Sequence, residues 1–214
     1  NKIQTDIPQL SRISYTVNNS GNIVLMLTLS ELTPVYSKSI YFVELNLEGD
    51  LIKSRYETTG NPITTSGYSI IGHDNGYYAF VDGVSSYFPT PGLGFSERLD
   101  LDTNFNIINV LPLPDGMNGF MTANKIDEQS YFLAGEVYYS GFYTEIALQK
   151  TDTSNTVVSS NHAGLPGDIP DGAAWFECMT VANDNSIYTG GVGYDVSSFA
   201  ECNLAFPKVF ILSN

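Results

Sequence analysis

The feature that most constrains the fold is a fourfold repeat of an apolar stretch, a polar turn and a second apolar stretch within 214 residues. The turns are Ser20-Gly21-Asn22, Asp74-Asn75-Gly76, Asp127-Glu128-Gln129 and Asn183-Asp184-Asn185. Their middle residues are 54, 53 and 56 positions apart. A period of this length is the mark of an architecture in which each repeat is one supersecondary unit that buries its apolar faces against its neighbours.

The pattern inside each repeat is that of β-strands. After each turn comes an apolar or aromatic run typical of a strand buried on both faces, at residues 23–27, 77–81, 131–134 and 187–188. A third segment alternates apolar and polar residues at 41–47, 95–101, 144–148 and 209–212. A fourth segment follows in three repeats, at 51–56, 107–111 and 157–160. Residues 173–179 also contain good helix formers, but their place before the fourth turn favours a strand.

These patterns predict an all-β fold, a β-propeller built from four four-stranded antiparallel blades of about 53 residues each. Because the fourth repeat lacks its last strand, we expect the N-terminal strand to pair with it and close the ring. The alternative is that four blades form half of a larger ring, completed by a second copy or by other sequence. The expected single domain spans 1–214, with blades at 11–58, 66–112, 119–161 and 173–214 plus 2–7.

One stretch carries a resemblance to known repeats. Leu45-Asn46-Leu47-Glu48-Gly49-Asp50-Leu51-Ile52 is an apolar strand ending in a Gly-containing turn before the next strand. It resembles the divergent blade repeats of bacterial secreted and lipoprotein β-propellers. The resemblance implies a bacterial cell-surface or secreted protein and no particular activity.

The amino-acid composition limits the kinds of partner that this chain can bind. The formal net charge is −14, from 9 Lys+Arg against 23 Asp+Glu, so nucleic acid and anionic membranes would be repelled. No apolar run reaches the roughly 20 residues that span a bilayer, and we expect no membrane insertion. The chain begins with Asn1, and its few Lys and many Asn, Ser, Thr and Tyr favour an extracytoplasmic location. The two cysteines, Cys178 and Cys202, form either one disulfide or two buried thiols.

No segment specifies a catalytic centre, a metal site or a cofactor, and we expect none. Residues 100–106 present oxygen side chains at alternate positions, as a calcium loop does, but lack its Gly and Glu, which favours a structural turn. His73 precedes a turn and is expected to be part of it. His162 lies in a long loop with Asp168 and Asp171, where acid or base chemistry is conceivable.

The strongest functional pattern is positional. In a propeller, the connections between second and third strands emerge on the same face as those between blades. In this sequence the connections between second and third strands carry aromatic residues: Tyr36, Tyr87, Phe88, Tyr138, Tyr139, Phe142, Tyr194 and Phe199. The predicted binding residues are Tyr36, Tyr87, Phe88, Tyr138, Tyr139, His162, Asp168, Asp171 and Trp175.

Aromatic rings beside carboxylates suit recognition by stacking and hydrogen bonding. We therefore expect a monomeric, extracellular or cell-surface module that binds a glycan or a protein. The alternative is a glycoside hydrolase or lyase that uses carboxylates on the same face.

Overall fold

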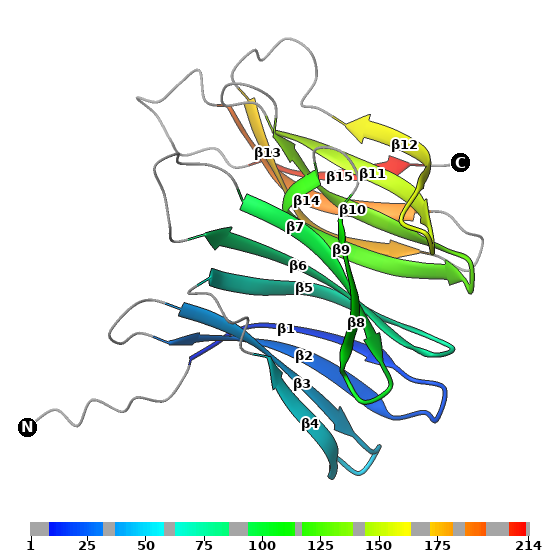
Figure 1. Ribbon diagram of the computed structural model, residues 1–214. Helices are drawn as coiled ribbons and strands as arrows, with labels where there is room; N and C mark the ends of the chain where they lie inside the picture. The colour runs from blue at the N-terminus through cyan, green and yellow to red at the C-terminus, as the bar shows by residue number, and fades with distance from the viewer. Residues whose placement is uncertain are drawn as a thin grey trace, which may run out of the picture. The chain divides into compact units, whose positions relative to one another are not determined.

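The computed structural model shows an all-β chain (Figure 1). It describes residues 9–31, 37–57, 63–85, 94–113, 117–138, 144–163, 172–181, 187–195 and 206–212. Every regular element among these residues is a strand, and none is a helix long and apolar enough to cross a membrane. The segment at 173–179 is a strand as predicted, within β13 (Gly172–Val181).

The chain divides into two compact units, residues 1–112 and 113–214. We call the strands of each sequence repeat a blade and number the blades in chain order. Unit 1 holds blades 1 and 2, and unit 2 holds blades 3 and 4. Strands occur in the described residues where the repeat pattern predicts them.

In unit 1 each blade is a four-stranded antiparallel sheet whose strands are adjacent in chain order (Figure 1). Blade 1 consists of β1 (Gln9–Val17), β2 (Ile23–Glu31), β3 (Ser37–Leu45) and β4 (Leu51–Glu57). Blade 2 consists of β5 (Ile63–His73), β6 (Gly76–Ser85), β7 (Gly94–Asp102) and β8 (Ile107–Pro112).

The core of unit 1 lies between its two blades. It includes Val24, Met26, Ile40 and Phe42 from blade 1, and Ile70, Tyr77, Ala79, Val81, Leu99, Leu101 and Phe105 from blade 2. Phe105 is fully buried at φ 64° in the turn after β7, and its ring lies 5.5 Å from Phe42 and 5.4 Å from Tyr77. Aromatic pairs at this separation add about 0.5–1.5 kcal/mol beyond area burial.

The first strands of the two blades run side by side with a constant offset of 56 residues. Ser14 Oγ accepts a hydrogen bond from the Ile70 amide at 3.0 Å, and Thr16 Oγ1 accepts one from Gly72 at 3.2 Å. Thr28 Oγ1 accepts from the Gly67 amide at 2.9 Å. Because β5 is the edge strand of its sheet, these hydroxyls satisfy amides that have no strand partner on that side.

Unit 2 contains one seven-stranded sheet. Blade 3 supplies β9 (Met117–Asp127), β10 (Ser130–Tyr138), β11 (Thr144–Asp152) and β12 (Val157–Ala163). Blade 4 supplies β13, β14 (Ile187–Asp195) and β15 (Phe206–Leu212). One parallel pair, Thr144 with Ala173, links the strands of the two blades, and the Asn124 side chain of β9 also donates a hydrogen bond to the Met179 carbonyl of β13 at 3.2 Å.

The predicted closed ring of four blades is wrong. The described strands form three separate sheets, and none of these sheets closes on itself. Within the described residues, β15 pairs with β14. Residues 2–7, the predicted closing strand, lie outside the described part of the chain. The repeat pattern predicts the strands of each blade, but the number of blades in a ring depends on how successive blades pack, which the pattern does not encode.

The first strands of blades 1, 2 and 4 each contain a β-bulge that the sequence pattern does not reveal, and β9, the first strand of blade 3, shows two register shifts against β10. The pairing register shifts between Leu10 and Arg12, between Gly67 and Ser69, and between Phe176 and Cys178. A bulge adds one residue to one strand and increases its twist. A register shift is thus shared by the first strands of all four blades, although its distance from the hairpin turn differs between them.

Candidate functional site

Several connections of unit 2 leave from the same end of its sheet. Residues 139–143 join β10 to β11, residues 164–171 join β12 to β13, and residues 196–205 join β14 to β15. At this end Tyr138 pairs with Thr144, and Gly172 pairs with Asp195. We call it the loop end of unit 2.

A row of four paired residues crosses the sheet at the loop end. Tyr138 pairs with Thr144, Thr144 with Ala173, and Ala173 with Tyr194. Because neighbouring strands lie about 4.8 Å apart, the row spans about 14 Å of backbone. Two of its four members are tyrosines.

Two further predicted residues lie near this row. Trp175 is two residues beyond Ala173 along β13 and pairs with Val192. His162 pairs with Ala147, three residues beyond Thr144 along β11. The backbone thus brings Tyr138, His162 and Trp175 to the same end of one sheet. Tyr194, which the sequence pattern had assigned to a connection, is in β14.

The other six predicted binding residues lie outside the described residues: Tyr36, Tyr87, Phe88, Tyr139, Asp168 and Asp171. Cys202, one of the two cysteines for which the sequence leaves a disulfide or a pair of thiols open, also lies outside the described residues. Cys178 is within β13, opposite Gly190.

Unit 1 contains a buried charge cluster that the sequence pattern missed. Glu44 is 4% exposed, and its Oε1 accepts hydrogen bonds of 2.8 Å from the side-chain amides of Asn18 and Asn22. Its Oε2 lies 2.7 Å from Lys53 Nζ, an ion pair whose angle falls short of a hydrogen bond. Lys53 Nζ also donates to the Thr103 carbonyl, which links blade 1 to the β7–β8 turn of blade 2.

The electrostatics of this cluster argue for a structural role. Burial by itself raises the pKa of Glu44, but the Lys53 contact and the two asparagine hydrogen bonds outweigh it and hold that pKa below the ordinary value. Burial also raises the pKa of nearby Tyr77. A carboxylate held ionised with its oxygens occupied is a poor proton donor. The cluster fastens the two blades, because Lys53 contacts both Glu44 of blade 1 and Thr103 of blade 2.

The segment considered for calcium is a structural turn, as the sequence favoured. Asp102 Oδ1 accepts hydrogen bonds of 2.8 Å from the amides of Asn104 and Asn106, and Oδ2 accepts one of 2.7 Å from the Asn106 side chain. The other carboxylate of the segment, Asp100, pairs with the buried Arg98 at 2.7 Å. Among the described residues, no group of three His, Cys, Asp or Glu side chains could hold a metal ion. His73, predicted as a turn residue, accepts a hydrogen bond from the Asn75 amide at 3.3 Å.

Comparison with known proteins informs the fold. No family model and no curated protein matches the chain. Two solved structures are similar: an apocarotenoid oxygenase/RPE65 chimera and a Glu-to-Asp variant of Synechocystis apocarotenoid oxygenase. Each has a TM-score of 0.51 and 12% identity, and the match covers 99% of this chain and 52% of the other.

These neighbours have a seven-bladed propeller-type fold, which is the second reason why the four-bladed ring is wrong. This chain spans about half of their length. At 12% identity the similarity concerns the arrangement of strands alone and supports no shared activity or site.

Proposed function

We propose that this chain is an extracytoplasmic binding module whose loop end in unit 2 recognises a glycan. The observation that supports the proposal is the row Tyr138–Thr144–Ala173–Tyr194, with Trp175 two residues beyond it. Aromatic rings offer flat apolar faces that lose little conformational entropy on binding. Threonine, which stands in this row at Thr144, is a residue type that hydrogen-bonds to hydroxyl groups.

A protein ligand is the second class that the same residues would suit, because Tyr and Trp are enriched at protein interfaces. The net charge of −14 favours a neutral or cationic ligand of either class over an anionic one. The oxygenase activity named for the structural neighbours is not proposed for this chain. The likeness to them is one of fold.

The test is a glycan array probed with the parent chain and with Trp175→Ala and Tyr138→Ala. If these residues are anchors, each substitution should weaken binding at least tenfold, since anchoring aromatics contribute about 2 kcal/mol or more. The melting temperature should change little. Tyr15→Ala is the matched control, because Tyr15 is 70% exposed and lies in unit 1.

Three results would contradict the proposal. The first is binding that Tyr15→Ala weakens as much as Trp175→Ala does. The second is a large fall in melting temperature for both aromatic variants, which would place these residues in the core. The third is turnover of chromogenic glycosides by the parent chain, which would favour the carboxylate enzyme instead.

A further inference from the structure

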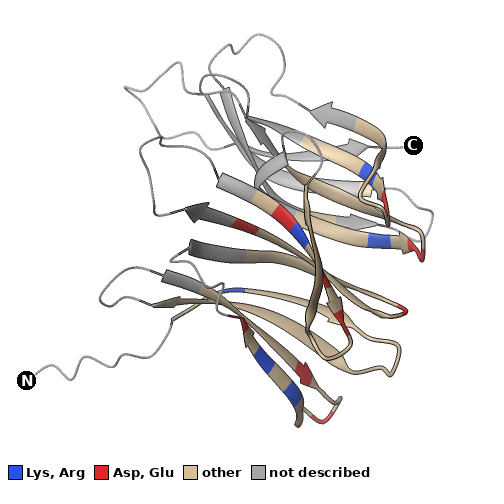
Figure 2. Cartoon of the chain, viewed as in Figure 1, with Lys and Arg blue, Asp and Glu red and all other residues tan. Residues whose placement is uncertain are grey.

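The hairpin turn between β5 and β6 contains an exposed asparagine that is followed by glycine. Asp74 and Asn75 form the turn, and His73 pairs with Gly76 across it. Both turn residues are exposed, and the tip of the hairpin is acidic (Figure 2). The end of a hairpin is a part of a sheet that opens at little cost, because few contacts hold it closed.

The side chain of Asn75 is not held in place. Its carboxamide makes no hydrogen bond within the described part of the chain, whereas its backbone amide donates to His73 Nδ1 at 3.3 Å. By contrast, Asn22 at the β1–β2 turn donates from its side chain to Glu44 Oε1 at 2.8 Å. The carboxamide of Asn75 is therefore open to reaction.

The packing of the sheet requires the residue after Asn75 to be glycine. Gly76 has φ +154°, and a Cβ at this position would lie 1.9 Å from the Leu101 carbonyl oxygen. A residue without a Cβ gives the least steric hindrance when its backbone nitrogen approaches the preceding side chain. The fold thus places an exposed carboxamide directly before the residue type whose nitrogen can reach it most easily.

We propose that Asn75 is a site of spontaneous deamidation. Asparagine is among the chemically labile residues of proteins. The Gly76 nitrogen attacks Asn75 Cγ to form a cyclic imide, while the Cγ–Nδ2 bond breaks and Nδ2 leaves as ammonia with the proton of the Gly76 amide. Water then opens the imide. Cleavage between the nitrogen and Cγ gives Asp, and cleavage between the nitrogen and the main-chain carbonyl carbon gives isoaspartate.

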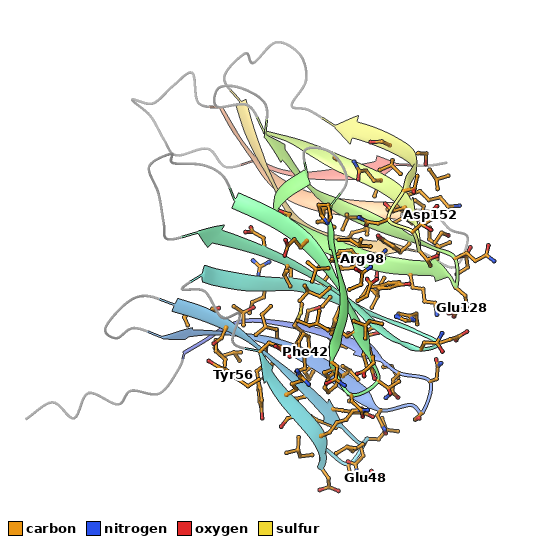
Figure 3. The ribbon with its side chains drawn as sticks, viewed as in Figure 1. Phe42, Glu48, Tyr56, Arg98, Glu128 and Asp152 are labelled. Carbon is orange, nitrogen blue, oxygen red and sulfur yellow. The ribbon has the colours of Figure 1, made fainter. Side chains whose placement is uncertain are left out.

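The two products should differ in their effect on unit 1. The turn is fixed on both sides, because the His73 ring stacks on Tyr78 at 4.3 Å and Gly76 has no space toward Leu101. Arg98, labelled in Figure 3, in turn lies 4.2 Å from the centre of the Tyr78 ring. The Asp product keeps the main chain unchanged. Isoaspartate inserts an extra methylene into the main chain between these fixed ends and should lower the stability of the hairpin.

Asn104 is a control for the identity of the following residue. It is also exposed in a turn of unit 1, and its side chain makes no hydrogen bond to any described residue. It precedes Phe105, whose side chain is fully buried and whose amide donates to the Asp102 carbonyl at 3.0 Å. The nitrogen that would attack the Asn104 side chain is thus hindered and already bonded.

Asn118 is a control for the local structure. It precedes Gly119, so the reacting dipeptide is the same as in the β5–β6 turn. Asn118 lies in β9, however, where it pairs with Glu136 of β10. A difference between the two Asn-Gly sites therefore reports the turn and not the sequence.

The experiment is incubation of the 214-residue chain in mildly alkaline buffer, followed by digestion and mass spectrometry of the peptides. In the folded chain Asn75 should react faster than Asn118 by about tenfold or more, because a hairpin end opens more easily than a strand within a sheet. Asn104 should also react at least about tenfold more slowly than Asn75, because its neighbour is not glycine. In urea, Asn75 and Asn118 should react at similar rates.

The proposal concerns unit 1 and does not depend on glycan binding. An Asn75 that stays unmodified overturns it, as do equal rates at Asn75 and Asn118 in the folded chain. A difference between these two sites that persists in urea also overturns it. Asn75→Asp supplies the Asp product alone and should melt as the parent does, whereas the aged chain should melt at a lower temperature. Equal melting of the two would contradict the effect assigned to isoaspartate.

Discussion

Replacing Glu44 by Gln tests whether the buried charge cluster fastens the two blades of unit 1. The substitution keeps the shape and the Oε1 acceptor for Asn18 and Asn22. It removes the ion pair with Lys53 and places an amide at or near the Lys53 ammonium, 2.7 Å from the original oxygen. The change therefore removes the charge and the favourable contact with Lys53 while it keeps the shape of the side chain.

The expected magnitude follows from the burial of the two partners. Removing one partner of a fully buried pair costs about 3–5 kcal/mol. Glu44 has a side-chain exposure of 5%, but Lys53 is 31% exposed and regains water, so we expect about 2 kcal/mol. The entropy of unfolding is about 2.1 cal/mol/K per residue. For unit 1, residues 1–112, a loss of about 2 kcal/mol therefore lowers the melting temperature by about 8 °C.

The assay is thermal unfolding followed by circular dichroism at pH 7 and at pH 3. Because the pKa of Glu44 is lower in the folded than in the unfolded chain, the stabilisation is present above the unfolded value, near 4.5, and is lost as pH falls below it. The difference between parent and Glu44→Gln should therefore shrink at pH 3. Glu48→Gln makes the same charge change at an exposed turn and should have no measurable effect. A Glu44→Gln melting temperature within 1–2 °C of the Glu48→Gln value at pH 7 would refute the reasoning.

Two further outcomes are expected. Gly76→Ala should lower the free energy of unfolding by about 3 kcal/mol in denaturant, because the new Cβ would lie 1.9 Å from the Leu101 carbonyl oxygen. Gly21→Ala is the control, because Gly21 has φ +80° and open space around it, and it should lower the free energy of unfolding by about 1–2 kcal/mol. Equal losses in the two variants would contradict the predicted clash at Gly76. Asn106→Ala should raise the pKa of Asp102 toward 3.8 in an NMR titration, because the Asn106 side chain and amide hold it low. Asp127, whose low pKa comes from Gln129 and Ser130, should not move, and an unchanged Asp102 would disprove the assignment.

The strands could be predicted from the sequence because the turns and apolar runs are local signals. The hairpin turn after β7 is an example, since Asp102 and Asn106 carry in their own side chains the bonds that form it. Ring size could not be predicted in this way. It depends on the angle between successive blades, which the alternation of residues along a strand does not encode. The bulges near Ser11 and Tyr68 were also missed, since one extra residue barely disturbs an apolar pattern.

The candidate site was predictable only as a set of connections with aromatic residues. That Tyr138 and Tyr194 share a row depends on the pairing of Thr144 with Ala173, a contact between blades. Glu44 was missed because a polar residue in an alternating strand ordinarily faces water. The available signal was that the residues beside Glu44 on its own face, Val24, Met26 and Phe42, are apolar, so both faces of blade 1 carry apolar residues.

The hydroxyls that blade 1 presents to β5 also bear on colloidal behaviour. An edge strand with unsatisfied amides is a template on which another chain can add a strand, and aggregation begins in this way. Here Thr28, Ser14 and Thr16 occupy the amides of Gly67, Ile70 and Gly72. Blade 1 therefore acts as a shield for β5. Any perturbation that loosens blade 1 while blade 2 stays folded exposes that edge and favours precipitation over simple loss of structure.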